Sequence, residues 1–181
     1  MIERQDIKAA VFFDRDGTLN RSASPGEYIR CPASLQLLPG AAAAVRRINN
    51  IGFLAVLITN QRWLSEPGAD PRAYALIELK LSHLLAAEGA RLDASYTCPH
   101  AVDSCDCRKP MPGLLLRAAD DLRTCLSDSY FIGDSITDVE VGAAVGATTI
   151  LVSPGGATNN SRFANYVVDN IQEAVEVVLA L

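Results

Sequence analysis

Residues 9–18 of this chain read Ala-Ala-Val-Phe-Phe-Asp-Arg-Asp-Gly-Thr, and they decide the fold. An apolar run that ends at charged residues and glycine is typical of a parallel strand covered on both faces. In open α/β sheets, ligands bind beyond the carboxyl ends of the strands, and side chains two positions apart on a strand point the same way. Asp14 and Asp16 are therefore candidate site residues, although a solvated Asp-Gly turn would explain them equally well if they stood alone.

Polar groups also follow a second apolar run, residues 53–58. Thr59 and Asn60 supply a hydroxyl and an amide that suit a phosphate oxygen, or they cap the next turn. Arg108 and Lys109 lie in a later loop, where a lysine is usually a solvated surface charge. Beside paired carboxylates, Lys109 would instead neutralise a phosphoryl group during its transfer.

An acidic pair follows a third apolar run, residues 129–132. Asp134 and Asp138 either open a helix, as N-cap residues do, or ligate a metal ion. The two interpretations are compatible, because Asp138 can cap the helix while Asp134 binds the metal.

The chain as a whole is predicted to alternate strands with helices. Strands are expected near residues 9–13, 53–58, 94–97, 129–132, 148–152 and 166–168, and helices near 40–51, 71–89, 113–124, 138–146 and 170–180. This alternation predicts a doubly wound, Rossmann-like α/β fold with a mainly parallel sheet and helices on both faces. In the second helix, Leu76, Leu79, His83 and Leu84 are helically spaced, which favours His83 as a residue of an amphipathic face rather than a ligand.

The composition indicates a folded globular chain, since 49% of the residues are hydrophobic and 20% are charged. No apolar run approaches the ~20 residues that a membrane helix needs, and the charged start of the chain does not resemble a signal peptide. We therefore expect a cytoplasmic protein without a membrane partner, and we expect a monomer. The net charge of −5 argues against a nucleic-acid partner but leaves room for a small anionic substrate, because local cations can dominate the field of a site.

A cluster of cysteines is the second strong signal. Three cysteines and one histidine fall within ten residues: Cys98, His100, Cys105 and Cys107. Three thiolates and one imidazole can close a tetrahedral, structural zinc site. Disulfides, which are rare without a secretory signal, and unrelated buried cysteines are the alternatives. Because Arg108 and Lys109 follow directly, we predict that zinc fixes this loop so that both cations face the substrate.

The motifs at these strand ends, taken in order, resemble the haloacid dehalogenase superfamily of phosphotransferases. The matching residues are Asp14-Arg15-Asp16-Gly17-Thr18, Thr59, Lys109, and Gly133-Asp134 with Asp138. The resemblance covers most of the chain and implies one phosphatase domain over residues 1–181, with a zinc loop at 98–107. The segments before Thr59 and Lys109 are too short for the separate cap domain of many members, so an uncapped core is expected.

The resemblance also implies a mechanism, which is hydrolysis of a phosphate monoester through an aspartyl-phosphate. Asp14 is the expected nucleophile and Asp16 the expected acid and base. Mg²⁺ is expected to contact Asp14, Asp134 and the backbone carbonyl of Asp16. Thr59 and Lys109 are expected to bind the phosphoryl group, with Asp138 as an orienting residue. Arg108 is a further catalytic candidate that would clamp a second phosphate.

The cysteine loop narrows the resemblance to two groups that use Mg²⁺ and structural zinc. These are the D-glycero-D-manno-heptose 1,7-bisphosphate 7-phosphatases and the histidinol-phosphate phosphatases. Asn20, the Gly26-Glu27-Tyr28-Ile29 segment and the Lys109-Pro110-Met111-Pro112-Gly113 entry to a helix favour the heptose group. The expected substrate contacts are Tyr28, Asn60, Gln61, Arg108, Lys109 and Ser135. A sugar bisphosphate is the preferred substrate, with histidinol phosphate or another small sugar phosphate as the alternative and a non-catalytic zinc-binding interaction module as a remote one.

Three departures from the heptose group bear on the fine specificity. The gap between His100 and Cys105 is short, as it is in the histidinol-phosphate phosphatases and in some heptose enzymes. Residues 62–68 replace the usual Ser-Gly-x-x-Arg-Gly continuation of the heptose enzymes, and Trp63 in this segment either walls the site or packs in the core. Ser135 stands where those enzymes often have lysine.

Overall fold

The apolar run before Asp14 forms strand β1 (Ala10–Phe13), which is buried along its whole length. Its side chains alternate between two cores, with Val11 and Phe13 in one and Ala10 and Phe12 in the other. A strand that buries both faces lies inside a sheet rather than at its edge. This is the physical reason for the unbroken apolar sequence.

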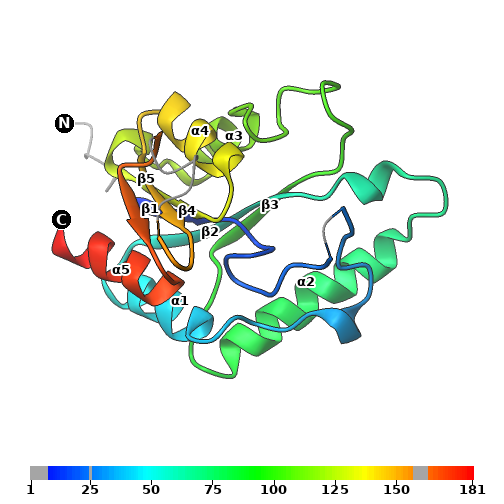
Figure 1. Cartoon of the computed structure of the whole chain (residues 1–181), viewed down its shortest axis with the longest axis horizontal. Helices are drawn as coiled ribbons and strands as arrows, with labels where there is room; N and C mark the ends of the chain where they lie inside the picture. The colour runs from blue at the N-terminus through cyan, green and yellow to red at the C-terminus, as the bar shows by residue number, and fades with distance from the viewer. Residues whose placement is uncertain (1–7, 25, 157–162) are drawn as a thin grey trace, which may run out of the picture.

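The computed structural model describes residues 8–24, 26–156 and 163–181, and its named strands form one parallel sheet (Figure 1). The other strands are β2 (Leu54–Asn60), β3 (Ala94–Cys98), β4 (Tyr130–Gly133), β5 (Thr148–Val152) and β6 (Tyr166–Val168). Their order is β3-β2-β1-β4-β5-β6, and every neighbouring pair is parallel. The predicted strands are thus confirmed. No named strand of the described chain leaves this sheet, in accord with the expected core without a separate cap.

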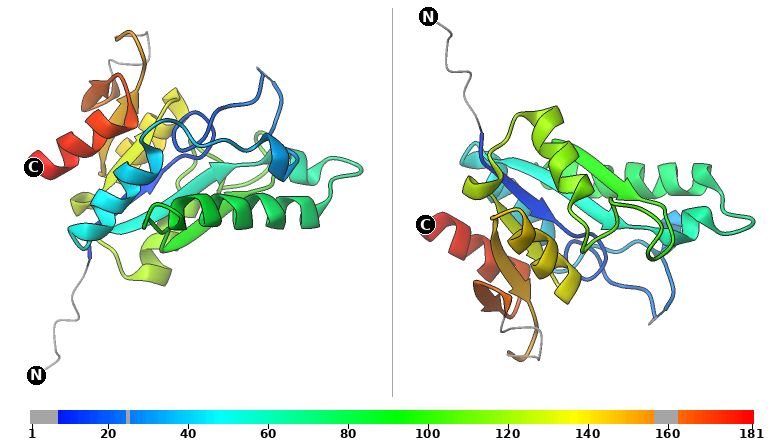
Figure 2. Two further views of the ribbon diagram at one scale, coloured as in Figure 1. Left: turned by 90° about the horizontal axis from the view of Figure 1, so that it is seen from below. Right: turned by 90° about the horizontal axis from the view of Figure 1, so that it is seen from above.

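Helices cover both faces of the sheet (Figure 2). They are α1 (Ala41–Asn50), α2 (Pro71–Ala86), α3 (Gly113–Leu122), α4 (Ile136–Ala144) and α5 (Ile171–Ala180), with short 3₁₀ turns η1 (Pro32–Ser34), η2 (Arg62–Ser65) and η3 (Leu126–Asp128). Helices α1, α2 and α5 pack in the core that contains Val11, and α3 and α4 pack in the core that contains Phe12. The doubly wound fold is therefore confirmed. Among the described helices, none has both the length and the apolar character that a bilayer crossing requires.

Helix α2 buries a different face from the one that its leucines suggested. Leu76 and Leu79 are 54% and 50% exposed, whereas Ile77, Leu81 and Leu85 are buried. His83 lies with the exposed leucines. The expected stripe was wrong for Leu76 and Leu79, whereas Leu84 packs against the core, because two overlapping apolar stripes run along this helix and only contact with the sheet selects between them.

The strand order reverses at β1, which lies between β2 and β4. Chain segments leave β1 and β4 in opposite directions along the sheet, which opens a crevice at their carboxyl ends. Gly17, at a φ of +95°, makes the turn after β1. A Cβ atom at this position would collide with the Asp134 carboxylate, so glycine also lets the two strand ends approach each other.

Candidate active site

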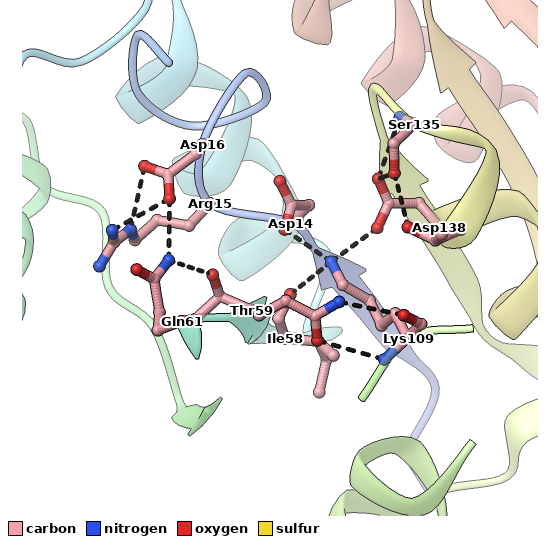
Figure 3. A network of polar contacts seen from close by, with 11 residues as sticks. Asp14, Arg15, Asp16, Ile58, Thr59, Gln61, Lys109, Ser135 and Asp138 are labelled. Atoms are coloured by element: carbon pink, nitrogen blue, oxygen red, sulfur yellow. Dashed lines mark hydrogen bonds and ion pairs between the residues drawn. The ribbon is translucent and has the colours of Figure 1, made fainter. Parts of the chain in front are cut away.

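Lys109 lies at the centre of a buried charge cluster at this crevice (Figure 3). Its Nζ donates to Asp14 Oδ1 and to Asp138 Oδ1, each at 2.6 Å, and to the Ile58 carbonyl oxygen at 3.0 Å. The three hydrogens of the ammonium group therefore each have a partner. The lysine that the sequence left open as a surface charge is in fact 4% exposed and is paired with Asp14.

Asn60 fixes the backbone of Lys109 at the end of β2. Its Oδ1 accepts from the Lys109 backbone N–H, and its Nδ2 donates to the Lys109 carbonyl oxygen, both at 3.1 Å. These two bonds attach the loop after β3 to the sheet. Because the Asn60 amide is already engaged by the main chain, its expected contact with a sugar stays a prediction.

Asp138 holds the other side of Lys109 from the first turn of α4. Its Oδ2 accepts from the Ser135 backbone N–H at 3.1 Å and from the Ser135 hydroxyl at 2.6 Å, which forms a capping box at this helix. Its Oδ1 is bonded to Lys109, and the residue is 1% exposed. Asp138 thus caps the helix and at the same time contacts Lys109, and its orienting role stays a prediction.

Asp14 and Asp134 have raised pKa values in this cluster. Burial raises the pKa of Asp14 to about 7, with Asp138 and Asp134 adding to the rise and Lys109 opposing it. Withdrawal from water, together with Asp138, raises the pKa of Asp134 to about 6, although this residue keeps an exposed edge. Burial acts to lower the pKa of Lys109, but Asp138 and Asp14 outweigh it, so the net shift is upward and the lysine stays charged. The cluster therefore holds excess negative charge.

These residues fit a hard divalent cation. Asp14, Asp134 and Asp138 each offer an oxygen atom, and these atoms lie within 4.8 Å of one another. Because both oxygens of Asp138 already accept hydrogen bonds, Asp14 and Asp134 are the residues with oxygens to spare. Mg²⁺ suits one or two carboxylates and retained waters, and a cation here would relieve the repulsion within the cluster. The Asp16 side chain is outside this group, so its predicted contact with the metal, through the backbone carbonyl, stays a prediction.

We expect Mg²⁺ to stabilise the protein more at pH 8 than at pH 5.5. The pKa of Asp14 rises on folding from 3.8 to about 7, and that of Asp134 from 3.8 to about 6. Groups with raised pKa values stabilise the metal-free fold at low pH, and this contribution is lost as the pH rises through the folded pKa values. Mg²⁺ competes with those protons, so thermal denaturation with and without MgCl₂ should show an increment in Tm that grows between pH 5.5 and 8. Asp134→Asn should flatten this dependence, and an increment that shrinks with pH would contradict the assignment.

The Asp16 carboxylate turns toward a second network, away from Lys109 (Figure 3). Its Oδ1 accepts from Arg15 Nε at 3.3 Å and from Asn20 Nδ2 at 2.8 Å. Its Oδ2 accepts from Arg15 Nη2 at 3.0 Å and from Gln61 Nε2 at 2.8 Å. Asp14 and Asp16 thus border the same cavity, but their carboxylates bind different partners, because β1 ends at Phe13 and the strand alternation does not continue into the turn.

A cavity of about 290 Å³ opens over both networks. The predicted residues that line it are Asp14, Asp16, Tyr28, Thr59, Asn60, Lys109, Asp134 and Ser135. The segment that contains Tyr28 forms one wall and contributes Glu27. Arg108 is outside the lining of this cavity; it is partly buried, and its Nη1 is buried without a hydrogen-bond partner among the residues that the structure describes.

The location of Gln61 does not fit its expected contact with a sugar. This residue is fully buried and does not line the cavity. The reason is that β2 continues through Asn60 and delivers the next side chain below the cavity floor rather than into the opening. There its amide contacts other side chains of the site.

The four predicted zinc ligands converge. Cys98 Sγ lies 3.6 Å from Cys105 Sγ and 3.4 Å from Cys107 Sγ, and His100 Nδ1 lies 3.7 Å from Cys98 Sγ and 3.2 Å from Cys107 Sγ. Ligands at the usual Zn–S and Zn–N distances on a tetrahedron are separated by roughly 3.5 Å, so the geometry suits zinc. Cys31 and Cys125 stand apart from this cluster as free cysteines, as expected. The Ser65 hydroxyl donates to the Pro99 carbonyl oxygen and so joins η2 to this loop.

Two residues of the second network, Arg15 and Glu78, were not expected in the site. Arg15 is fully buried, where it forms ion pairs with Asp16 at 3.0 Å and with Glu78 at 3.4 Å. Trp63 is 2% exposed and donates from Nε1 to Gln61 Oε1 at 2.9 Å, so it packs in the core rather than walling the cavity. Arg15 could have been suspected from its place between two aspartates. Nothing in the sequence near Glu78 indicates its link to the site, because the two partners are 63 positions apart.

Comparison with known proteins agrees with this geometry. Residues 106–174 match the HAD-hydrolase-like family model. The D-glycero-beta-D-manno-heptose-1,7-bisphosphate 7-phosphatase of Pasteurella multocida is 31% identical, over 97% of this chain and 99% of that protein. The D-glycero-D-manno-heptose-1,7-bisphosphate 7-phosphatase of Thermosynechococcus vestitus is 36% identical, over 93% and 94%. A solved structure of D,D-heptose 1,7-bisphosphate phosphatase from B. bronchiseptica, in complex with magnesium and phosphate, superposes with a TM-score of 0.84 at 28% identity and covers 95% of this chain and 98% of that one.

Proposed function

We propose a function from one premise: this chain belongs to the heptose-bisphosphate phosphatase family, whose named members are phosphatases with a HAD-like fold. The proposed reaction is removal of the 7-phosphate of D-glycero-D-manno-heptose 1,7-bisphosphate. The observation that carries the proposal is the buried contact between Lys109 and Asp14, which places a cation and a carboxylate together at the floor of the cavity.

In the proposed reaction, an Asp14 carboxylate oxygen attacks phosphorus as the bond from phosphorus to the sugar oxygen breaks. Asp16 gives a proton to the departing oxygen and later takes one from the water that cleaves the aspartyl-phosphate. Lys109 and the Thr59 hydroxyl hold the phosphoryl oxygens. Asp14 and Asp134, with the Asp16 carbonyl, would hold Mg²⁺, whose positive charge would offset the negative charge of the phosphate.

The zinc loop serves this reaction as a structural support. Four close ligands leave no open position for substrate, and Lys109 follows the last ligand, Cys107, by two residues. The loop is thereby held where Lys109 can reach Asp14. We propose structural Zn²⁺ at this cluster on the basis of its donor set and spacing.

Loss of the zinc cluster should therefore lower activity strongly. Cys105→Ser should remove zinc, loosen the loop and reduce kcat/KM by about a hundredfold, as a misplaced catalytic group does. Cys31→Ser is the matched control, because Cys31 lies apart from the cluster. Metal analysis and phosphate release measure the two effects. A zinc-free variant with full turnover would refute the structural role of the loop.

Arg108 is the proposed clamp for the second phosphate of the substrate. Its guanidinium can bind a phosphate through two N–H groups, and because Arg108 does not line the cavity, the side chain would have to turn toward it. Arg108→Ala should raise KM for the heptose bisphosphate by about tenfold or more, with a much smaller effect on a simple monophosphate. Arg117→Ala, which changes an exposed arginine of α3, is the control. An equal rise in KM for both substrates would exclude the proposed role of Arg108 in binding the second phosphate.

One observation favours the alternative substrate class, histidinol phosphate. Glu27 borders the cavity while Arg108 does not, and an acidic wall suits a primary amine better than a second phosphate. Phosphate release from both anomers of the heptose bisphosphate and from histidinol phosphate, measured side by side with Mg²⁺, decides between them. A preference of about a hundredfold in kcat/KM for the heptose would support the proposal, and the reverse preference would overturn it.

A further inference from the structure

The amide of Gln61 connects two residues with different proposed tasks. Its Nε2 donates to Asp16 Oδ2 and to Thr59 Oγ1, each at 2.8 Å (Figure 3). Asp16 and Thr59 both border the cavity, whereas Gln61 is fully buried beneath them. One NH₂ group, with its two hydrogens, therefore sets the separation between an acid–base carboxylate and a phosphate-binding hydroxyl.

Trp63 determines which way this amide points. Its Nε1 donates to Gln61 Oε1 at 2.9 Å, and an indole N–H can only donate. If the amide were reversed, two donors would face each other at Trp63, and the amide oxygen would face the Asp16 carboxylate. The indole is therefore a lock that keeps the Gln61 NH₂ group on the side of the catalytic residues.

The lock is built on rigid elements. Trp63 is 2% exposed, and the edge of its ring meets Tyr74, with 6.2 Å between the ring centroids. The backbone N–H of Gln61 donates to the carbonyl oxygen of Cys98, a proposed zinc ligand, at 2.7 Å. The amide is thus fixed from the side of α2 and from the side of the zinc loop, as a precise catalytic geometry requires.

We propose that Gln61, oriented by Trp63, is a positioning residue for the proton transfer by Asp16. This inference deepens the proposed function and rests on it. In the first step the Asp14–phosphorus bond forms, the bond from phosphorus to the sugar oxygen breaks, and the Asp16 proton goes to that oxygen. The proton must arrive while Thr59 holds a phosphoryl oxygen, so the distance between Asp16 and Thr59 governs this step.

The leaving group distinguishes this role from a merely structural one. An alkoxide needs the proton, whereas p-nitrophenolate leaves without it, and kcat/KM reports the steps up to the release of the first product. Gln61→Met keeps the size of the side chain and removes both donors. We expect it to lower kcat/KM for the heptose bisphosphate by about a hundredfold, and for p-nitrophenyl phosphate by less than about fivefold. Equal losses on both substrates, or no loss on the bisphosphate, would overturn the inference.

A double-mutant cycle tests the part assigned to Trp63. Trp63→Phe should lower kcat/KM for the bisphosphate by about tenfold with little change for p-nitrophenyl phosphate, and this loss should vanish in the Gln61→Met background. Tyr74→Phe, which keeps the aromatic contact with Trp63 and removes the hydroxyl that contacts Thr97, is the control for packing. If the losses of the two single variants were additive in the double variant, the proposed role of Trp63 in orienting the Gln61 amide would be refuted.

The two substrates also separate failure of this inference from failure of the proposed function. If the unmodified protein hydrolyses neither phosphate with Mg²⁺ present, the proposed function is wrong and the inference falls with it. If it hydrolyses both and Gln61→Met behaves like the unmodified protein, only the inference is wrong. Activity on p-nitrophenyl phosphate also shows that each variant is folded.

Discussion

Asp14→Asn should reduce phosphate release by about 10⁴-fold or more while the protein stays folded. The amide has no negatively charged oxygen to attack phosphorus, so the first bond of the aspartyl-phosphate cannot form. Steady-state phosphate release at saturating Mg²⁺ measures the loss, and acid-quenched protein should contain no phosphoryl group.

The stability of the same variant provides its control. Burial and the neighbouring carboxylates raise the pKa of Asp14 to about 7, so the charged form is costly in the metal-free protein. A neutral amide removes that cost, while Lys109 keeps its ion pair with Asp138. The Tm of metal-free Asp14→Asn at pH 8 should therefore be equal to or above that of the unmodified protein. Substantial remaining turnover in a clean, folded preparation would refute the assignment of Asp14 as the nucleophile.

Lys109→Met should abolish activity and also destabilise the fold by about 3–5 kcal/mol at pH 8, since breaking a buried ion pair leaves charges without a partner. Lys109 is 4% exposed and neutralises both Asp14 and Asp138, so two carboxylates lose their counter-ion at once. Chemical denaturation of the metal-free proteins measures the difference in the free energy of unfolding.

The pH dependence of this loss identifies its cause. Without Lys109, the pKa of Asp14 should rise above its present value of about 7, so protonation relieves the unpaired charge at low pH. The destabilisation should thus be smaller at pH 5 than at pH 8. Lys80→Met is a matched control on α2, where the lysine donates to the Pro32 carbonyl oxygen. A loss of stability that is independent of pH would point to lost packing instead.

Lys109 also shows where reasoning from the sequence ends. Its motif marked it as a candidate, but a loop lysine is usually solvated, and the partners that make it a buried site residue lie 95 and 29 positions away. The same holds for Asp16, whose carboxylate meets Gln61 across 45 positions. Contacts of this range leave no periodic signal, because they depend on which strands become neighbours.

The sequence by itself determined the strands, the helices, the family and the cluster of cysteines and histidine that could bind zinc. Each of these rests on local chemistry: apolar runs that end in charge, and four metal-binding side chains within ten residues. Only the tertiary structure decided which face α2 buries, that Gln61 lies beneath the cavity rather than in it, and that Trp63 orients its amide. The physical reason is that burial and side-chain direction follow from packing between distant segments, while propensity and ligand spacing are properties of adjacent residues.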